Sequence, residues 1–207
     1  AFDREGTGFY FITDVEGDFK QLAWQSLEPG SEPVIITGDI PWHVEGAALS
    51  EARDRMAFVV NEEGFSRLYL LDPVSRQYRR VDAIPTGLVG GLEFSPDGRG
   101  LLASIHDGTI YGWAIPSREP VFEPVSGVHT SHLLKLAFSP TGDKFATAST
   151  DGTSMMLAYP SGRLIGPAFG KDHQIGSVVF TPDGRVLIGG NANGAVSLWD
   201  MNRKMTI

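Results

Sequence analysis

Short apolar stretches alternate with polar turns along the whole chain, and the turns recur at a regular spacing. Three of them share one pattern, namely FSPDG at residues 94–98, FSPTG at 138–142 and FTPDG at 180–184. Two weaker copies begin at Phe2 (FDREG) and at Leu49 (LSEARDR). Five copies about 42–47 residues apart indicate a chain built from one repeated unit.

Each unit contains a second, tighter turn between two apolar segments. The five tight turns are VEGD, NEEG, HDGT, TDGT and NANG, and the segments before them are FYFIT, MAFVV, GLLAS, KFATAS and RVLIGG. Glycine after Asp, Asn or Glu supplies the positive φ of a two-residue hairpin turn, and proline in SPDG presets φ for the preceding turn. No window sustains a helical period of 3.6 residues, so strands joined by turns are expected.

Four short antiparallel strands in each unit of about 40–45 residues are typical of a propeller blade. The predicted fold is therefore an all-β β-propeller of about five four-stranded antiparallel blades in a single domain, 1–207. The predicted blades are 1–43 (partial), 44–87, 88–127, 128–170 and 171–207. Inner strands are expected at 44–49, 88–94, 133–138 and 175–180, whereas only Ala1 precedes the first turn, so the first blade is expected to lack its inner strand.

An unpaired inner edge would expose backbone donors and acceptors to another chain. Three outcomes stay open from the sequence. The chain closes as a five-bladed ring with one thin blade, it remains an incomplete ring, or several copies combine into a closed assembly.

The last hundred residues resemble the WD-repeat family. HLLKLAFSPTGDKFATASTDGTSMMLAY at 132–159 and IGSVVFTPDGRVLIGGNANGAVSLWD at 175–200 follow its pattern, and the second segment ends in the pair Trp199–Asp200. The resemblance implies a hydrogen-bonded row of His, Ser or Thr, Asp and Trp within each blade.

The residues expected at these structural blade positions differ between the two repeats. In the fourth blade His129 and Asp151 match, a Ser or Thr of ATAS supplies the hydroxyl, and Tyr159 takes the place of the Trp. In the fifth blade Asn193 replaces the Asp, and His173 lies nearer to the strand than usual. Both networks are expected to be weakened.

The first hundred residues are similar to blades from the propeller of prolyl oligopeptidase family enzymes. This resemblance rests on residues 8–37 (GFYFITDVEGDFKQLAWQSLEPGSEPVIIT) and 61–81 (NEEGFSRLYLLDPVSRQYRRV), and the change between the two patterns falls near residues 104–107. The interpretation favoured by the sequence is an engineered or recombined hybrid of the two propellers, with no dedicated activity.

Two alternatives to the hybrid remain. The first is a natural WD-repeat-like protein–protein interaction scaffold, in which loops containing Trp42, His43, Arg118 and residues 129–132 make the contacts. The second is the propeller of a prolyl oligopeptidase family enzyme without its catalytic domain.

The sequence predicts no catalytic, cofactor-binding or metal-binding residue, and hence no enzyme. The nucleophile elbow G-x-S-x-G does not occur, and GFSRL at 64–68 carries only its first half. His129 and His132 lack a third ligand at a supporting spacing, and DVEGD at 14–18 lacks the rest of a calcium loop. With no cysteine in the chain, disulfides and thiolate sites are excluded.

The charge of the chain argues against nucleic acid and membrane partners. The formal net charge is −8, from 17 Lys and Arg against 25 Asp and Glu, without a basic cluster. No apolar run approaches the roughly 20 residues of a membrane span, and no signal peptide is visible. The remaining partners are other proteins, or a second copy that self-associates through the incomplete first blade. The compartment cannot be read from the sequence, although a natural protein of this composition is expected in the cytoplasm.

Overall fold

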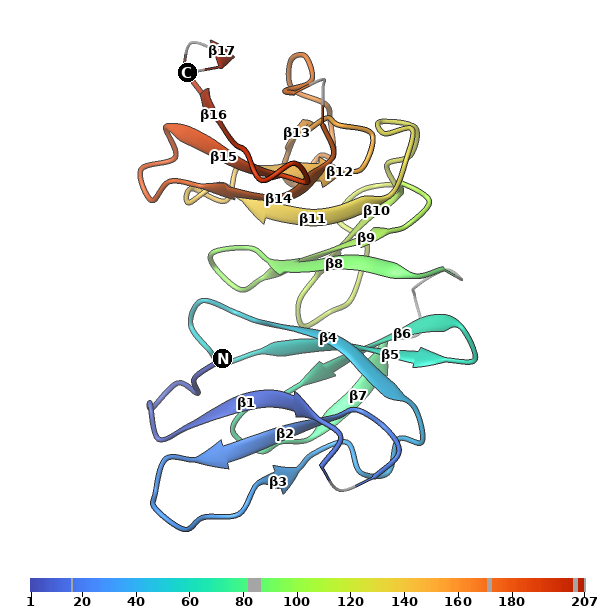
Figure 1. The fold of residues 1–207 in the computed structure, drawn as a ribbon, viewed down its shortest axis with the longest axis vertical. Helices are drawn as coiled ribbons and strands as arrows, with labels where there is room; N and C mark the ends of the chain where they lie inside the picture. The colour runs from blue at the N-terminus through green and yellow to red at the C-terminus, as the bar shows by residue number, and fades with distance from the viewer. Residues whose placement is uncertain (16, 82–86, 171–172, 203–204, 207) are drawn as a thin grey trace. The chain divides into compact units, whose positions relative to one another are not determined.

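The structure, a computed structural model, describes residues 1–15, 17–81, 87–170, 173–202 and 205–206. Within these ranges the chain forms seventeen strands and no helix, which confirms the all-β prediction. The strands belong to five antiparallel sheets, and each sheet is made from one continuous part of the sequence (Figure 1). Several small antiparallel sheets of this kind are consistent with a β-propeller.

The chain divides into two compact units, residues 1–88 and 89–207. The first unit contains a three-stranded sheet in the order β1-β2-β3 and a four-stranded sheet in the order β4-β5-β6-β7. Their bounds are β1 Gly8–Thr13, β2 Gln21–Ser26, β3 Val34–Ile35, β4 His43–Leu49, β5 Met56–Glu62, β6 Phe65–Leu71 and β7 Tyr78–Val81.

The core of the first unit lies between its two sheets. Tyr10 and Leu22 of the first sheet pack against Phe58 and Val60 of the second, and all four side chains are buried. Arg76, in the turn after β6, places its guanidinium carbon 3.9 Å from the ring centre of Trp24 in β2. A cation–π contact therefore adds to the apolar packing of these two sheets.

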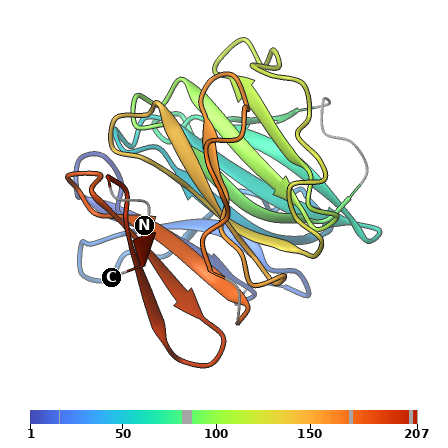
Figure 2. The same cartoon turned by 90° about the horizontal axis from the view of Figure 1, so that it is seen from above.

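The second unit contains three sheets, in the orders β8-β9-β10, β11-β12-β13 and β14-β15-β16-β17 (Figure 1). Figure 2 shows the same strands from above, coloured from green to red along the chain. Strand β11 lies beside β8 on one side and beside β14 on the other. The bounds are β8 Val89–Phe94, β9 Gly100–Ile105, β10 Ile110–Ala114, β11 Leu133–Phe138, β12 Lys144–Ser149, β13 Met156–Ala158, β14 Ile175–Phe180, β15 Val186–Asn191, β16 Val196–Asp200 and β17 Met205–Thr206.

Two of these sheets do not have the four strands that the sequence predicts. Among the residues that the structure describes, the chain beyond β10 makes only the isolated bridges Ile110–Val125 and Trp113–Pro120, and beyond β13 only Ser154–Phe169 and Leu157–Leu164. Residues 120–125 contain Pro120 and Pro124, which cannot donate to a ladder because proline has no backbone N–H. The expected outer strand of the β8–β10 sheet is thereby reduced to single contacts.

The recurring five-residue turn has the same geometry in each copy of the second unit. Gly98, Gly142 and Gly184 have φ of 68°, 70° and 67°, and each donates its N–H to the residue three positions earlier at 2.8–2.9 Å. Glycine adopts this left-handed conformation at no steric cost. The weaker copy that begins at Leu49 makes the same hydrogen bond with Arg53, whose φ is 55°.

Candidate functional site

His129 is the centre of a buried hydrogen-bonded network in the second unit. The residue lies in the loop before β11 and is 6% exposed. Its Nδ1 is 3.0 Å from an Asp151 carboxylate oxygen, and its Nε2 is 2.7 Å from the Thr147 hydroxyl. Thr147 belongs to β12 and Asp151 to the tight turn that follows it, so the network joins the loop of His129 to a strand and a turn that lie 18 and 22 residues further along the chain.

Hydrogen bonds fix both the imidazole and the carboxylate. Because the carboxylate only accepts, Nδ1–H donates to Asp151. Nε2 is hydrogen-bonded to the Thr147 hydroxyl, whose oxygen also accepts the Met155 N–H at 2.9 Å. Asp151 also accepts from the N–H groups of Thr130 (3.0 Å) and Thr153 (2.9 Å) and from the Thr153 hydroxyl (2.7 Å). Burial opposes ionisation of Asp151, but these hydrogen bonds outweigh it and lower the pKa of Asp151 to about 2.

The order carboxylate–imidazole–hydroxyl is also that of a nucleophilic triad. In such a triad the hydroxyl oxygen must reach a substrate carbonyl. Here Thr147 lies in the middle of β12 with 0% of its surface exposed, and its hydroxyl hydrogen-bonds to the backbone of Met155. The network therefore holds the loop of His129 in place and does not present a nucleophile to solvent.

In the fifth sheet the corresponding residues do not come together. Asn193 is exposed and accepts a local hydrogen bond from the Ala195 N–H at 3.0 Å. His173 is exposed as well, and its ring makes no hydrogen bond to any residue that the structure describes. Gly189 occupies the position of Thr147, so a hydroxyl is missing in addition to the carboxylate.

The register of the sheets corrects the expected place of Tyr159. Phe145 pairs with Leu157 in the fourth sheet, and Leu187 pairs with Trp199 in the fifth. Leu157 is thus the counterpart of Trp199, whereas Tyr159 follows two residues later, beyond the end of β13. Its ring meets Phe138 edge-on, with 5.0 Å between the ring centres.

Trp199 and Gly189 fit together in a way that sequence reasoning did not identify. Trp199 is 2% exposed, and a Cβ added at Gly189 would lie 2.5 Å from its indole ring. The indole thus fills the space that the Thr147 side chain takes in the preceding sheet. The glycine pair in RVLIGG, aligned with ATAS, is the sequence signal for this replacement. The neighbouring Asp200 accepts a hydrogen bond from the Asn202 N–H at 2.8 Å.

The loop of His129 carries further polar side chains at the surface of the second unit. The His132 ring lies 5.2 Å from that of His106, and its Nδ1–H donates to the His106 carbonyl at 2.8 Å. Asp107 and Thr130 are exposed beside them. Arg118, also expected to make contacts, lies in a separate turn after β10, with φ of 67°.

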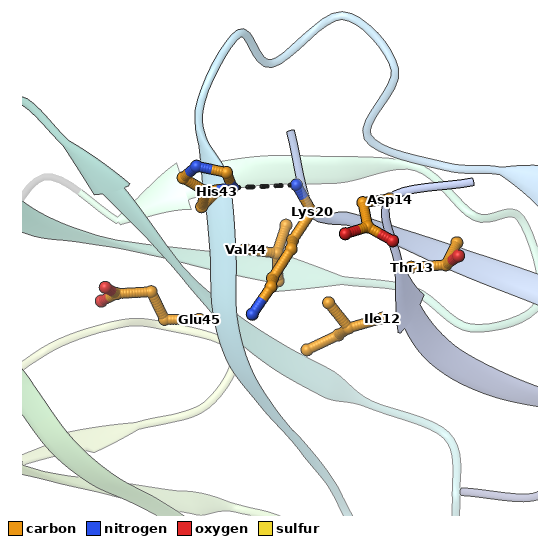
Figure 3. A pocket seen from close by; sticks show the side chains of 7 residues that line it. All are labelled: Ile12, Thr13, Asp14, Lys20, His43, Val44 and Glu45. Atoms are coloured by element: carbon orange, nitrogen blue, oxygen red, sulfur yellow. Dashed lines mark hydrogen bonds between the residues drawn. The ribbon is translucent and has the colours of Figure 1, made fainter. Parts of the chain in front are cut away.

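The first unit contains a cavity of about 640 Å³ beside β1 and β4. It is lined by Ile12, Thr13, Asp14, Lys20, His43, Val44 and Glu45 (Figure 3). The Lys20 N–H donates to His43 Nδ1 at 3.0 Å, and the Lys20 side chain points into the space between Glu45 and Ile12. Trp42, the other expected contact residue, is half-buried against the core of this unit.

The described residues contain neither a metal-binding cluster of three or more side chains nor a membrane-spanning helix. No group of three or more His, Cys, Asp or Glu side chains among them is arranged to hold a metal ion. No helix in the same part of the chain has the length and apolar character to cross a membrane.

Comparison with known protein families identifies the repeats of the second unit. Residues 123–156 and 164–200 each match the family model described as WD domain, G-beta repeat. The first segment contains Thr147, Asp151 and His129, and the second ends at the Trp199–Asp200 pair. The match supports a WD-repeat β-propeller.

Proposed function

We propose that the chain is a non-enzymatic protein-interaction scaffold of the WD-repeat type. The observation that carries the proposal is the saturated network of His129 inside a segment that matches a WD repeat. The network orders residues 129–132 without offering a reactive group, and WD-repeat domains commonly act as scaffolds for other proteins. Ordered loops on a rigid set of sheets are well suited to recognition.

The contact surface of this proposal is the histidine loop surface, defined as His106, Asp107, Thr130 and His132. Two of its backbone segments are already held, since Asp151 accepts from the Thr130 N–H and the His106 carbonyl accepts from His132. A partner that binds here does not have to order these loops, so little conformational entropy is lost on binding. Imidazole, carboxylate and hydroxyl groups together suit a polar partner surface.

Affinity capture followed by quantitative mass spectrometry tests the scaffold. The wild-type chain is compared with Thr130→Arg/His132→Glu and with the control Ser161→Arg, a substitution in an exposed turn outside the histidine loop surface. We expect a defined set of proteins that the control retains and the double variant loses at least tenfold. Equal capture by all three chains, or no capture beyond the matrix background, would refute the proposal.

The hybrid origin remains a second proposal, which concerns the source of the chain and not its chemistry. It is supported by the difference in sequence pattern between residues 8–81 and 132–200, and the family match covers only the later part. A single natural gene that carries both patterns without interruption would contradict it. The peptidase-propeller fragment stays a prediction from the first hundred residues alone.

A further inference from the structure

Two histidines from neighbouring sheets of the second unit meet at its surface. His106 follows directly after β9, and His132 directly precedes β11, which lies beside β9. Their ring centres are 5.2 Å apart, with 48° between the ring planes. The adjacent strand residues, Ile105 and Leu133, are both buried, so each histidine is attached to a fixed end of a strand. Rigid elements thus hold two imidazoles close together, as a precise binding site requires.

Gly90 of β8 makes this close approach possible. A Cβ at this position would lie 2.1 Å from the Leu133 carbonyl oxygen and 3.1 Å from Cδ2 of His106. A side chain here would therefore push the start of β11 away from β8 and displace the His106 ring. Glycine lets the two backbones approach because it has no Cβ. The position of the histidine pair is set by this backbone packing as well as by the rings themselves.

A hydrogen bond fixes the tautomer of His132. Its Nδ1 lies 2.8 Å from the His106 carbonyl oxygen, and because a carbonyl only accepts, Nδ1 carries the proton. The neutral ring of this exposed residue therefore has its lone pair on Nε2. Neither ring nitrogen of His106 hydrogen-bonds to a residue that the structure describes. An imidazole N–H donated to a backbone carbonyl is also the arrangement that orients metal-ligating histidines.

We propose that His106 and His132 together bind a divalent transition-metal ion of the class Zn²⁺, Cu²⁺ and Ni²⁺, with His132 as a ligand through Nε2. Imidazole nitrogen is a preferred ligand of these ions. With metal–nitrogen bonds of about 2.0–2.1 Å, each ring centre lies roughly 3 Å from the ion, so two rings on one ion have centres about 5–6 Å apart. The observed 5.2 Å meets this requirement. The two histidines are 26 residues apart, so no ligand spacing marks the pair in the sequence.

The pair supplies two ligands and leaves the other coordination positions of the ion open. Since no larger group of metal-binding side chains is arranged around it within the described residues, water completes the coordination in the free protein. Asp107, the next residue after His106, already accepts from the Thr109 N–H at 2.8 Å. A bound protein can replace a water with a side-chain donor of its own. This last step rests on the scaffold function proposed above, whereas binding of the ion does not.

Isothermal titration of ZnCl₂ into the metal-free chain at neutral pH tests the site. His106→Gln and His132→Gln each remove an imidazole but keep a polar side chain, and His173→Gln is the matched control, at an exposed histidine outside the pair. We expect wild type and His173→Gln to bind Zn²⁺ with affinities within twofold of each other. The other two variants are each expected to bind at least tenfold more weakly, with thermal unfolding in the absence of metal showing that they are folded.

A second measurement does not depend on protein variants. In nitrogen–proton NMR spectra of the histidine side chains, Zn²⁺ is expected to shift Nε2 of His132 and one ring nitrogen of His106, while Nδ1 of His132 keeps its proton. The rings of His43, His129 and His173 are expected to stay unchanged. No saturable binding of Zn²⁺, equal weakening in His173→Gln, or shifts confined to the other three rings would overturn the proposal.

Protein capture with and without EDTA separates the ion from the scaffold function. If EDTA and His106→Gln each reduce capture at least tenfold, the ion takes part in the contact with the partner. If Zn²⁺ binds the pair but the same proteins are captured in EDTA, only the step in which a partner ligates the ion is wrong. If Zn²⁺ does not bind while Thr130→Arg/His132→Glu loses the captured proteins, the metal site is wrong and the scaffold function stands.

Discussion

Replacing Asp151 by asparagine removes the one negative charge of the His129 network while keeping the shape of the side chain. Asparagine cannot accept as many hydrogen bonds, because one of its two terminal groups is an NH₂ donor. In the wild type, Asp151 accepts from Thr130, from Thr153 and from His129. The substitution therefore leaves at least one of these donors without its acceptor.

The size of the effect follows from the pKa of Asp151. Its folded-state pKa of about 2 lies below the ordinary 3.8, so the ionised group stabilises the folded chain at every pH above 3.8. The stabilisation is lost as the pH falls from 3.8 through 2. Since a tenfold change in an acid constant corresponds to ~1.4 kcal/mol, the full effect is about 2 kcal/mol, and roughly half of it is lost at pH 3.

Urea unfolding of wild type and Asp151→Asn at pH 6 and pH 3 measures this effect. We expect the variant to be less stable by about 2 kcal/mol at pH 6 and by about 1 kcal/mol at pH 3. Hydrogen exchange of residues 144–158 is expected to show the loss locally, in the β12–β13 hairpin. The matched control is Asp107→Asn, in the equivalent turn of the preceding sheet, where the carboxylate accepts from the Thr109 N–H at 2.8 Å.

Two results would refute the reasoning about Asp151. A difference between wild type and variant that is the same at both pH values would mean that ionisation of Asp151 does not stabilise the fold. A loss of equal size in Asp107→Asn would mean that any carboxylate in these turns has the same effect, whether or not a histidine contacts it.

Three further substitutions test the packing, each by thermal unfolding. Gly189→Thr forces a side chain into the Trp199 ring and is expected to lower stability by about 2–3 kcal/mol; an unchanged Tm would show that the indole does not fill this space. Gly184→Ala places a side chain at φ of 67° and should lower stability by about 1–2 kcal/mol, and stabilisation would contradict the turn geometry. Arg76→Lys keeps the charge but loses stacking on Trp24, for an expected loss of about 1 kcal/mol, and an equal Tm would argue against the contact.

The parts of the fold that could be predicted are those set by local chemistry. Glycine at positive φ and proline in the turn specify the hairpins wherever they occur, so the strand pairs on either side of 94–98, 138–142 and 180–184 follow from the sequence. The outer strands of the sheets were harder to predict, because the sequence shows the same polar break and apolar pair whether or not the segment hydrogen-bonds to its neighbouring strand. Pro120 and Pro124 were the sequence signal that one of them would be incomplete.

The residues of the His129 network could be predicted where the family pattern places one residue type at one position. His129 and Asp151 fit the family pattern and meet at 3.0 Å. Tyr159 was assigned to the wrong position because an aromatic residue near the end of a strand fits two registers, and the pairing of Phe145 with Leu157 within the sheet decides between them. The cavity beside β1 could not be predicted, since its lining joins residues 12–14 and 20 to residues 43–45, which are distant in the sequence.

The recurring turn also bears on how such a chain tolerates change. Its three copies in the second unit keep the same glycine conformation, while the side chains at one packing position vary between Trp113, Leu157 and Trp199. The turn keeps the spacing between strands, so the amino acid at each core position can change in one repeat without a matching change in the others. A hairpin from one repeat should therefore be exchangeable for another as a cassette, with any loss of stability confined to the side chains that meet across the new seam.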